Sequence, residues 1–310
     1  MLKKHSYPPH LSAVLQAVFV TFLWSTSWVF IKIGLKSHLP PLTFAGLRYT
    51  IAFLCLLPIL LINKEERQSV KQLNRKEWLK LSLLGVVFYS LTQGTQFLSL
   101  AFLPAAMVSM FLNLTSVFVA LSGIFLLKEY PAPIQWAGIA AAAGGIAVYF
   151  LPAGIAGIST TGILITFLCV ASNTASAVMG RHINHKSRLS PLVITFVSMG
   201  IGSLLLLAAG IIFQGTGEIS ITDWLIIIWL AVANTAFAFT LWNKSLKVLT
   251  AVESSILNSL MLPQIALLAL VFLGETLSIK QIAGLVLVSV GVLLVQLKKN
   301  FLKPARTGKQ

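Results

Sequence analysis

The sequence contains one pattern twice, and this duplication is the feature that most limits its fold. Residues 98–149 align without a gap with residues 244–295 at an offset of 146, and 14 of the 52 pairs are identical. The identical pairs include Ser99/Ser245, Leu103/Leu249, Ala105/Ala251, Glu129/Glu275, Gln135/Gln281, Gly138/Gly284 and Gly145/Gly291. Both copies are apolar over lengths that can cross a bilayer. Duplicated membrane units are the usual construction of a secondary transporter.

The composition requires a lipid environment. Apolar residues make up 57% of the 310 residues, charged residues make up 10%, and the mean hydropathy is +0.89, whereas a soluble domain is about 25% charged. The apolar runs are continuous rather than alternating, which favours transmembrane helices over barrel strands. The sequence therefore predicts an all-α integral membrane protein with ten transmembrane helices, within windows 12–34, 42–62, 79–101, 105–127, 134–151, 159–180, 191–213, 223–245, 251–273 and 279–297.

The charge distribution predicts the topology. The net charge is +15, but its placement does not indicate a nucleic-acid partner. With ten crossings and a cytoplasmic N-terminus, 19 of the 23 Lys and Arg residues fall on cytoplasmic segments, as the positive-inside rule requires. We therefore expect a multi-pass protein of the plasma or inner membrane with both termini in the cytoplasm.

The duplication divides the chain into two halves, 1–152 and 153–310. Pro41-Leu42 also matches Pro191-Leu192, at an offset of 150. Each half has five predicted helices, and because five is odd the second half enters the membrane from the opposite side. The two halves are then inverted repeats related by a pseudo-two-fold axis in the membrane plane, which is the construction expected for alternating access.

Several motifs resemble the EamA-like family of the drug/metabolite transporter superfamily. They are residues 234–244 (NTAFAFTLWNK), 250–255 (TAVESS), Pro263, Leu273-Gly-Glu275 and Gln281-Ile-Ala-Gly284, with weaker counterparts in the first half at Trp24-Ser25, Arg48, Lys128-Glu129 and Gln135-Trp-Ala-Gly138. The resemblance covers nearly the whole chain and implies the ten-helix fold and transport of a small organic solute, commonly an amino acid or another metabolite. The chain has Ser25 and Lys128 where the family usually has Gly.

Polar and aromatic residues recur near the midpoints of six predicted helices. Polar groups at this depth are unfavourable unless they are paired or hydrated, so we expect them to line a central cavity for substrate. The alternative is that they join neighbouring helices through hydrogen bonds. The candidate substrate-binding residues are Trp24, Ser27, Trp28, Tyr89, Gln93, Gln96, Asn113, Asn173, Asn234, Trp242 and Asn258.

Arg48 is a charged residue within the second predicted span. An unpaired guanidinium there is unfavourable by several kcal/mol, so we expect it either to pair with groups between helices or to contact an anionic group of substrate or lipid. Glu275 is a carboxylate near the same face that could reach it. Glu129 and Glu275 occupy helix ends, and we expect both to fix the geometry between the halves.

Two further residues are candidates for structural or gating roles. Glu253 lies at the start of the ninth span, where Thr250-Ala-Val-Glu253 reads as a capping box; coupling to a proton is the competing interpretation. Pro263 lies in the middle of the same span and has no proline counterpart, so it can mark a flexible point or a static kink.

The sequence favours transport over other functions. We expect a secondary transporter of a small organic metabolite, such as an amino acid, that works by alternating access; the direction, export, is what the family resemblance alone implies. An uptake permease or exchanger for another solute is the alternative, and a non-transporting scaffold is a third. No Gly-x-Ser-x-Gly elbow, phosphate loop or metal-ligand cluster indicates an enzyme, metal or cofactor. The expected partners are a small molecule and membrane lipid; proton coupling and the oligomeric state stay open.

Overall fold

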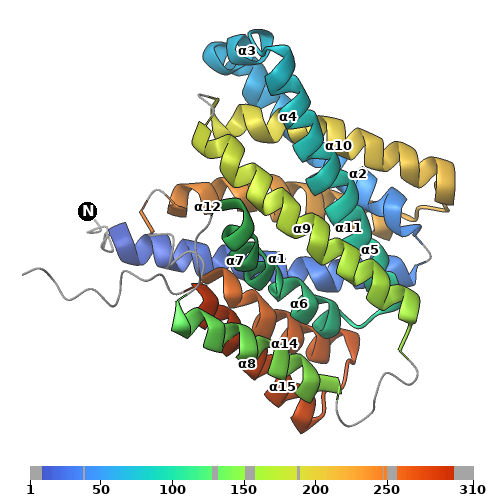
Figure 1. Cartoon of the computed structure of the whole chain (residues 1–310). Coiled ribbons are helices and arrows are strands. Elements are labelled where there is room, and N and C mark those ends of the chain that lie inside the picture. The colour runs from blue at the N-terminus through green and yellow to red at the C-terminus, as the bar shows by residue number, and fades with distance from the viewer. Residues whose placement is uncertain are drawn as a thin grey trace, which may run out of the picture.

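The structure is a computed structural model that describes residues 9–37, 39–127, 132–150, 158–186, 189–246, 248–249 and 257–296. All regular secondary structure in these residues is helical (Figure 1). The elements are α1 (Pro9–Lys36), α2 (Pro41–Ile62), α3 (Lys64–Lys71), α4 (Arg75–Gly85), η1 (Val86–Thr92), α5 (Gln93–Phe102), α6 (Ala105–Asn113), α7 (Thr115–Leu127), α8 (Pro133–Phe150), α9 (Thr160–Lys186), α10 (Pro191–Gln214), α11 (Ile221–Ala231), η2 (Val232–Phe237), α12 (Ala238–Leu246), α14 (Met261–Leu273) and α15 (Ile279–Gln296).

The helices form an interleaved bundle in which elements from the two ends of the chain lie side by side. α2 packs against α10 and α8 packs against α15, while α1 contacts α12 and α14 (Figure 1). α9 lies against η1, α5 and α7. The main core is therefore shared between residues before 152 and residues after 158, rather than divided into two separate cores.

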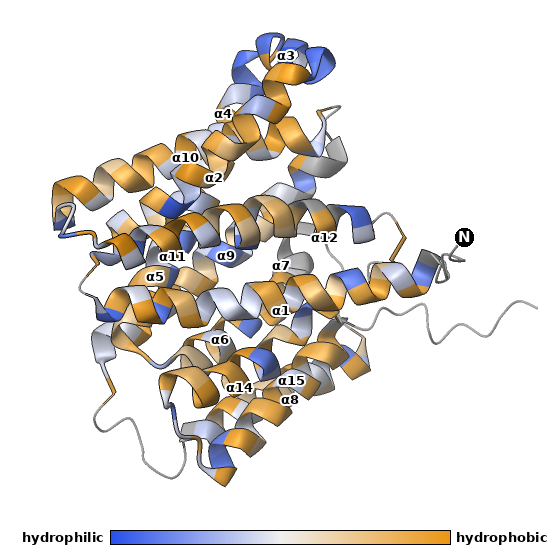
Figure 2. Ribbon diagram, turned by 180° about the vertical axis from the view of Figure 1, so that it is seen from behind, coloured by the Kyte–Doolittle hydropathy of each residue, from blue (hydrophilic) through white to orange (hydrophobic). Residues whose placement is uncertain are grey.

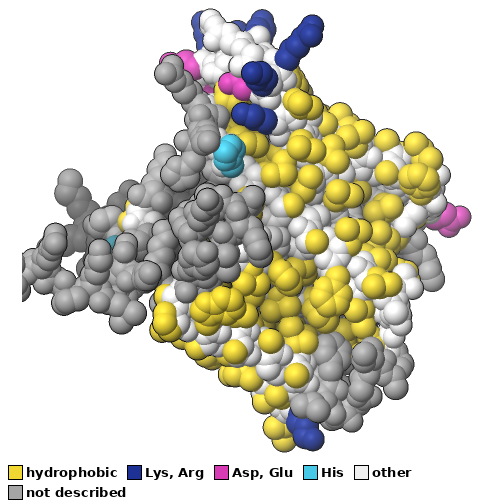
Figure 3. Space-filling view, viewed as in Figure 1, with side chains coloured by type: hydrophobic (Ala, Val, Ile, Leu, Met, Phe, Trp, Pro, Cys, Tyr) yellow, Lys and Arg dark blue, Asp and Glu magenta, His cyan; other side chains and the backbone are white. Residues whose placement is uncertain are grey.

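The outer surface of the bundle is apolar. Leu54, Leu164, Phe213, Leu225 and Val271 come from five different helices, and each is more than half exposed. The helices are predominantly hydrophobic along their length, and hydrophilic residues concentrate on α3 (Figure 2). In the view of Figure 3, hydrophobic side chains cover the middle of the molecule and most Lys and Arg side chains gather around α3. A soluble protein does not expose apolar surface on this scale, so the bundle fits a lipid environment.

Four of the described helices are individually long and apolar enough to cross a membrane: His10–Lys36, Pro41–Ile62, Thr160–Gly180 and Pro191–Gln214. The shorter apolar helices are Ala105–Val119, Ile221–Phe237, Leu257–Leu273 and Ile279–Val295. Helices occupy the described part of each of the ten predicted windows, but four of the windows contain interruptions that the hydropathy pattern did not predict.

Local sequence signals explain where several helices begin. Ser190 accepts a hydrogen bond from the amide of Val193, and Pro191 follows it at the first position of α10, where a missing amide donor costs nothing. Asn74 forms a capping box with Glu77 at the start of α4. The surface helix α3 was not predicted; Asn63 caps it by accepting from two backbone amides, and its charged residues place it outside the apolar layer.

Two π-helical turns, η1 and η2, interrupt otherwise continuous helices. They begin at Val86 and Val232, positions that are separated by the repeat offset of 146. Each joins two α-helices without a break in the helical chain, because the residues that flank each π turn keep right-handed helical backbone angles. π turns are rare and frequently occur at functional sites.

A second pair of interruptions falls at Leu114 and Leu260, which are also equivalent in the repeat. The Leu114 amide donates to the Phe111 carbonyl at 3.0 Å, and the Leu260 amide donates to the Leu257 carbonyl at 3.1 Å. Pro263 does not cause the second interruption, because the first half has the same interruption without a proline. Pro263 instead lies exposed in the first turn of α14, where proline removes no intrahelical hydrogen bond.

The contact between α8 and α15 is built on four glycines. A Cβ on Gly138 would lie 2.6 Å from the carbonyl oxygen of Gly291, and a Cβ on Gly284 would lie 2.7 Å from that of Gly145. The two helices are antiparallel, because residue numbers rise along one as they fall along the other. Gly138 is the repeat equivalent of Gly284, and Gly145 is the equivalent of Gly291, so exchanging the halves maps each of these two contacts onto the other.

Candidate functional site

A buried polar cluster surrounds Arg48 on α2. The side chain is 5% exposed, its Nε donates to Thr235 Oγ1 at 3.3 Å, and its guanidinium carbon lies 5.1 Å from the ring centre of Tyr49. A second ring, that of Phe97, lies 6.0 Å away. No carboxylate in the described part of the chain forms an ion pair with Arg48. Within the described residues, the hydrogen-bond and ring contacts of this cation are therefore with one hydroxyl group and two aromatic rings.

The structure gives Arg48 and Glu275 separate partners, contrary to the pairing that the sequence suggested. Both oxygens of Glu275 accept hydrogen bonds from the start of α6: Oε1 from the Ala105 amide at 2.7 Å and Oε2 from the Ala106 amide at 3.2 Å. The first amides of a helix have no intrahelical acceptor and favour a negative charge. Glu275, which belongs to the second half, therefore caps the start of α6 in the first half.

η2 supplies Asn234 beside Thr235. The Asn234 side chain is fully buried, and its Nδ2 donates to the carbonyl of Leu23 and to Thr26 Oγ1 on α1. Its backbone carbonyl accepts from Trp24 Nε1 at 3.1 Å, and its Oδ1 has no hydrogen-bond partner among the described residues. Neighbouring residues of one π turn therefore contact two different helices: Asn234 contacts α1 and Thr235 contacts α2.

Aromatic side chains cover one side of this polar contact. The Trp24 ring centre lies 5.2 Å from that of Trp242 and 5.3 Å from that of Phe239. Both partners belong to α12, the helix that continues from η2. The spacing is typical of aromatic packing, and it places three of the predicted residues, Trp24, Asn234 and Trp242, in one group.

Tyr49 extends the cluster towards the π turn of the first half. Its hydroxyl donates to Gln93 Oε1 at 2.6 Å, and its ring centre lies 5.7 Å from that of Tyr89 in η1. The cluster thus joins the neighbourhoods of both π turns. Tyr49 was not among the residues selected from the sequence; the available signal was that it is next to Arg48.

The other predicted residues lie in different environments. Ser27 and Trp28 are buried, Gln96 is half-buried and Asn258 is exposed. Asn113 donates to the Ser109 carbonyl of its own helix at 2.9 Å, and Asn173 donates to Thr115 Oγ1 of α7 at 3.2 Å. The Asn173 contact joins α9 to α7, which is the helix-joining alternative considered from the sequence, whereas the Asn113 contact stays within α6. Glu129 and Glu253 lie outside the described residues.

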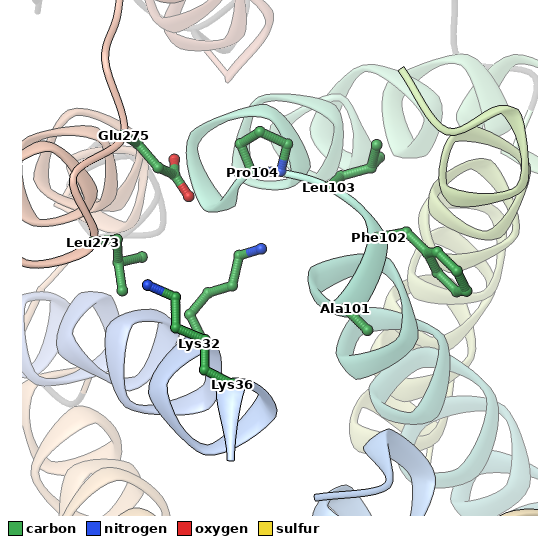
Figure 4. A pocket seen from close by; sticks show the side chains of 8 residues that line it. All are labelled: Lys32, Lys36, Ala101, Phe102, Leu103, Pro104, Leu273 and Glu275. Atoms are coloured by element: carbon green, nitrogen blue, oxygen red, sulfur yellow. The ribbon is translucent and has the colours of Figure 1, made fainter. Parts of the chain in front are cut away.

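Two cavities of about 280 Å³ each lie at the end of the bundle where α1 ends. Both include Lys32 and Lys36, and neither includes a member of the Arg48 cluster. The first is lined by Lys32, Lys36, Ala101, Phe102, Leu103, Pro104, Leu273 and Glu275 (Figure 4). The second adds Leu35, Leu39, Pro40, Pro41 and Leu100 to the shared Lys32, Lys36 and Ala101.

The described residues contain no group of three or more His, Cys, Asp or Glu side chains that could hold a metal ion. The two cysteines, Cys55 and Cys169, are free thiols. The chemistry available in the cluster is therefore the binding of charge, hydrogen bonding and aromatic contact, supplied by Arg48, Thr235, Asn234 and the surrounding rings.

Comparison with known proteins gives one consistent class. The sequence model of the EamA-like transporter family matches residues 11–151 and 160–297. A protein of Salmonella typhimurium strain LT2 described as a probable amino-acid metabolite efflux pump is 29% identical over 290 residues, covering 89% of this chain and 92% of the relative. The uncharacterized transporter YvbV of Bacillus subtilis strain 168 is 26% identical, covering 97% and 96% of the two chains. A protein known from its crystal structure has the same fold, with a TM-score of 0.62 at 20% identity, covering 92% of this chain and 97% of that one.

Proposed function

Because the chain belongs to the EamA-like transporter family, we propose that it is a secondary transporter that exports an amino acid or a similar small metabolite. The observation that carries the proposal is the Arg48 cluster. It places a buried cation between residues of the two halves, with Thr235 as its hydrogen-bonding partner. A solute carboxylate is the ligand that such a cation favours. The name of the Salmonella relative agrees with this substrate class.

The proposed architecture is ten crossings arranged as two inverted repeats, 1–152 and 153–310. Three pairs of features recur at the offset of 146: the π turns, the interruptions at Leu114 and Leu260, and the glycine contacts of α8 and α15. A two-fold axis perpendicular to an antiparallel helix pair exchanges its members. If α8 and α15 both cross the bilayer, that axis lies in the membrane plane, as an inverted repeat requires.

A total of ten crossings requires that the helices interrupted by π turns also span the membrane. The continuous helical segment from Arg75 to Phe102 has a length of about 40 Å at 1.5 Å per residue, enough for a hydrocarbon core of about 30 Å. The segment from Ile221 to Leu246 is similar in length. The segregation of Lys and Arg then places both termini in the cytoplasm.

In the proposed mechanism the two halves rock around the Arg48 cluster. The contacts of Asn234 with Leu23 and Thr26, and of Arg48 with Thr235, join the halves. Exchange of these contacts for contacts to the solute would let one side open while the other closes. The Asn234 Oδ1 accepts no hydrogen bond from the part of the chain that the structure describes, and it is an acceptor that the solute ammonium group would satisfy.

The Arg48 cluster also bears on whether transport is coupled to protons. The contacts of the described cluster involve no carboxylate, so uniport or exchange is favoured over proton antiport by this observation. Uptake rather than export is the alternative direction. An imposed pH gradient that changes the flux of the purified protein would indicate proton coupling through a group outside the cluster.

The test is a flux assay with the purified protein in phosphatidylcholine liposomes loaded with a mixture of the twenty amino acids. We expect the release of at least one of them, and we expect Asn234→Leu to slow this release about tenfold because the variant lacks the two amide contacts. Thr161→Leu changes an exposed residue of α9 and is the matched control. If the wild-type protein releases none of the amino acids, the proposed substrate class is wrong.

A further inference from the structure

The cavity drawn in Figure 4 lies between the end of α1, the start of α6 and the end of α14. Lys32 and Lys36 are one helical turn apart on α1, so they lie on the same face of the helix. In Figure 4 the two lysine side chains extend from α1 into the space below Glu275 and Pro104, and one of the two amino groups points towards Leu273. Lys32 is half-buried and Lys36 is exposed. Two cations from one helix thus face a cavity of about 280 Å³.

The charges around this cavity do not cancel. Glu275 is the only acidic residue in its lining, so the lining has two positive charges and one negative charge. The Glu275 oxygens accept from the Ala105 and Ala106 amides, and neither lysine forms an ion pair with a carboxylate in the described residues. The cavity next to it shares both lysines and contains no acidic residue. The hydrogen-bonding partners of Glu275 are thus the amides of α6. Its charge also acts on Lys32 without an ion pair between them, and the lining keeps a net positive charge for a ligand.

We propose that the two lysines bind the carboxylate of the transported metabolite at this end of the bundle, as a second site on its route. This inference rests on the proposed function. The net charge of the lining suits a single negative charge, and Glu275 would repel a ligand with two. A carboxylate can accept more than the two hydrogen bonds that Glu275 already receives, so Glu275 can also accept from the ammonium group of an amino acid.

The lining fits a small amphipathic solute. Apart from the three charged residues, the first cavity is lined by apolar side chains, including Phe102, Leu103 and Leu273. A volume of about 280 Å³ is at the lower end of the range for small-molecule pockets. A cleft with one sign of charge and apolar walls raises the local concentration of an oppositely charged solute. The site would collect the carboxylate before or after its contact with Arg48.

The same lysines could instead attract an anionic lipid headgroup, and the experiment separates these two sources of negative charge. The protein is placed in liposomes of phosphatidylcholine alone, which has no net negative charge, and uptake of each transported amino acid is measured against its concentration. The double variant Lys32→Gln/Lys36→Gln is compared with Lys280→Gln. Lys280 is an exposed lysine in the first turn of α15 and lines neither cavity.

We expect the double variant to raise the half-saturating concentration about tenfold, which corresponds to the loss of roughly one charge-assisted hydrogen bond. Lys280→Gln should behave as the wild type. Lys36→Gln alone should give a smaller increase; because Lys36 is exposed, this variant also guards against a folding defect in the double variant. The N-acetyl form of the amino acid should compete with wild-type uptake, and the decarboxylated amine should compete at least tenfold less well.

Three results would overturn the inference while leaving the proposed function intact. The first is a half-saturating concentration that is the same in the wild type and in both lysine variants. The second is that the amine competes as well as the N-acetyl acid. The third is an effect of the lysine substitutions that appears only when anionic lipid is added. Failure of the proposed function is recognised separately, because the wild-type protein would then transport none of the amino acids.

Discussion

The crossing of α8 and α15 makes opposite predictions for two adjacent glycines. A Cβ on Gly145 would lie 2.7 Å from the backbone nitrogen of Val288 and 2.8 Å from the carbonyl oxygen of Gly284. A Cβ on Gly144 would meet only Leu287 Cδ2, at 3.8 Å. The first distances are shorter than van der Waals contact and involve backbone atoms, which cannot move alone. The second is an ordinary contact with the end of a flexible side chain.

We therefore expect Gly145→Ala to destabilise the protein and Gly144→Ala to stabilise it slightly. Inserting a methyl group into a packed contact lowers the free energy of unfolding by about 1–3 kcal/mol. Replacing a helical glycine by alanine where space exists raises it by roughly 0.5–1 kcal/mol. The two variants should thus differ by about 1.5–4 kcal/mol, although they introduce the same methyl group in the same turn of one helix.

The measurement is reversible unfolding in mixed detergent micelles titrated with sodium dodecyl sulfate, followed by tryptophan fluorescence. Gly291→Ala is the repeat-related partner of Gly145→Ala, and its Cβ would lie 2.5 Å from the Ala142 nitrogen, so it should destabilise to a similar extent. Equal stability of the two variants at positions 144 and 145 would refute the close backbone contact. A large effect at Gly145 with none at Gly291 would argue against the two-fold arrangement.

Two further predictions concern the charged groups. Arg48→Met removes a buried cation that lacks a carboxylate partner in the described residues, so flux should fall at least about tenfold while the free energy of unfolding stays the same or rises; unchanged flux in the liposome assay would show that Arg48 does not contact the solute. Glu275→Gln weakens the cap on the amides of Ala105 and Ala106 and should lower the free energy of unfolding by about 1–2 kcal/mol. The exposed Glu218→Gln should leave it unchanged in the same titration, and equal effects of the two variants would contradict the capping role.

The hydropathy pattern predicted the helical class and the approximate extent of the helices, because burial in lipid requires long continuous apolar runs whatever the substrate. It did not predict the π turns or the interruptions at Leu114 and Leu260. These change the backbone over only a few residues and leave the mean hydropathy of each window unaltered. The surface helix α3 was missed for the opposite reason, since its polar residues give no apolar signal.

The sequence predicted part of the candidate site. Trp24, Asn234 and Trp242 were selected by their depth and lie together in the structure, whereas Asn113 and Asn173 were selected by the same criterion and contact other helix residues. The depth of a residue along its helix does not determine whether its side chain faces a cavity or a neighbouring helix. Glu275 was considered as a carboxylate that could reach Arg48, but in the structure its oxygens accept from the free amides at the start of α6.

Pro263 lies in the first turn of α14, and the interruption that precedes it is present in the other half without a proline. The equivalent position, Val117, also falls in the first turn of its helix, α7. Proline at either place therefore removes no intrahelical hydrogen bond. A search for moving parts in this chain should start from the paired interruptions at Leu114 and Leu260 rather than from its prolines.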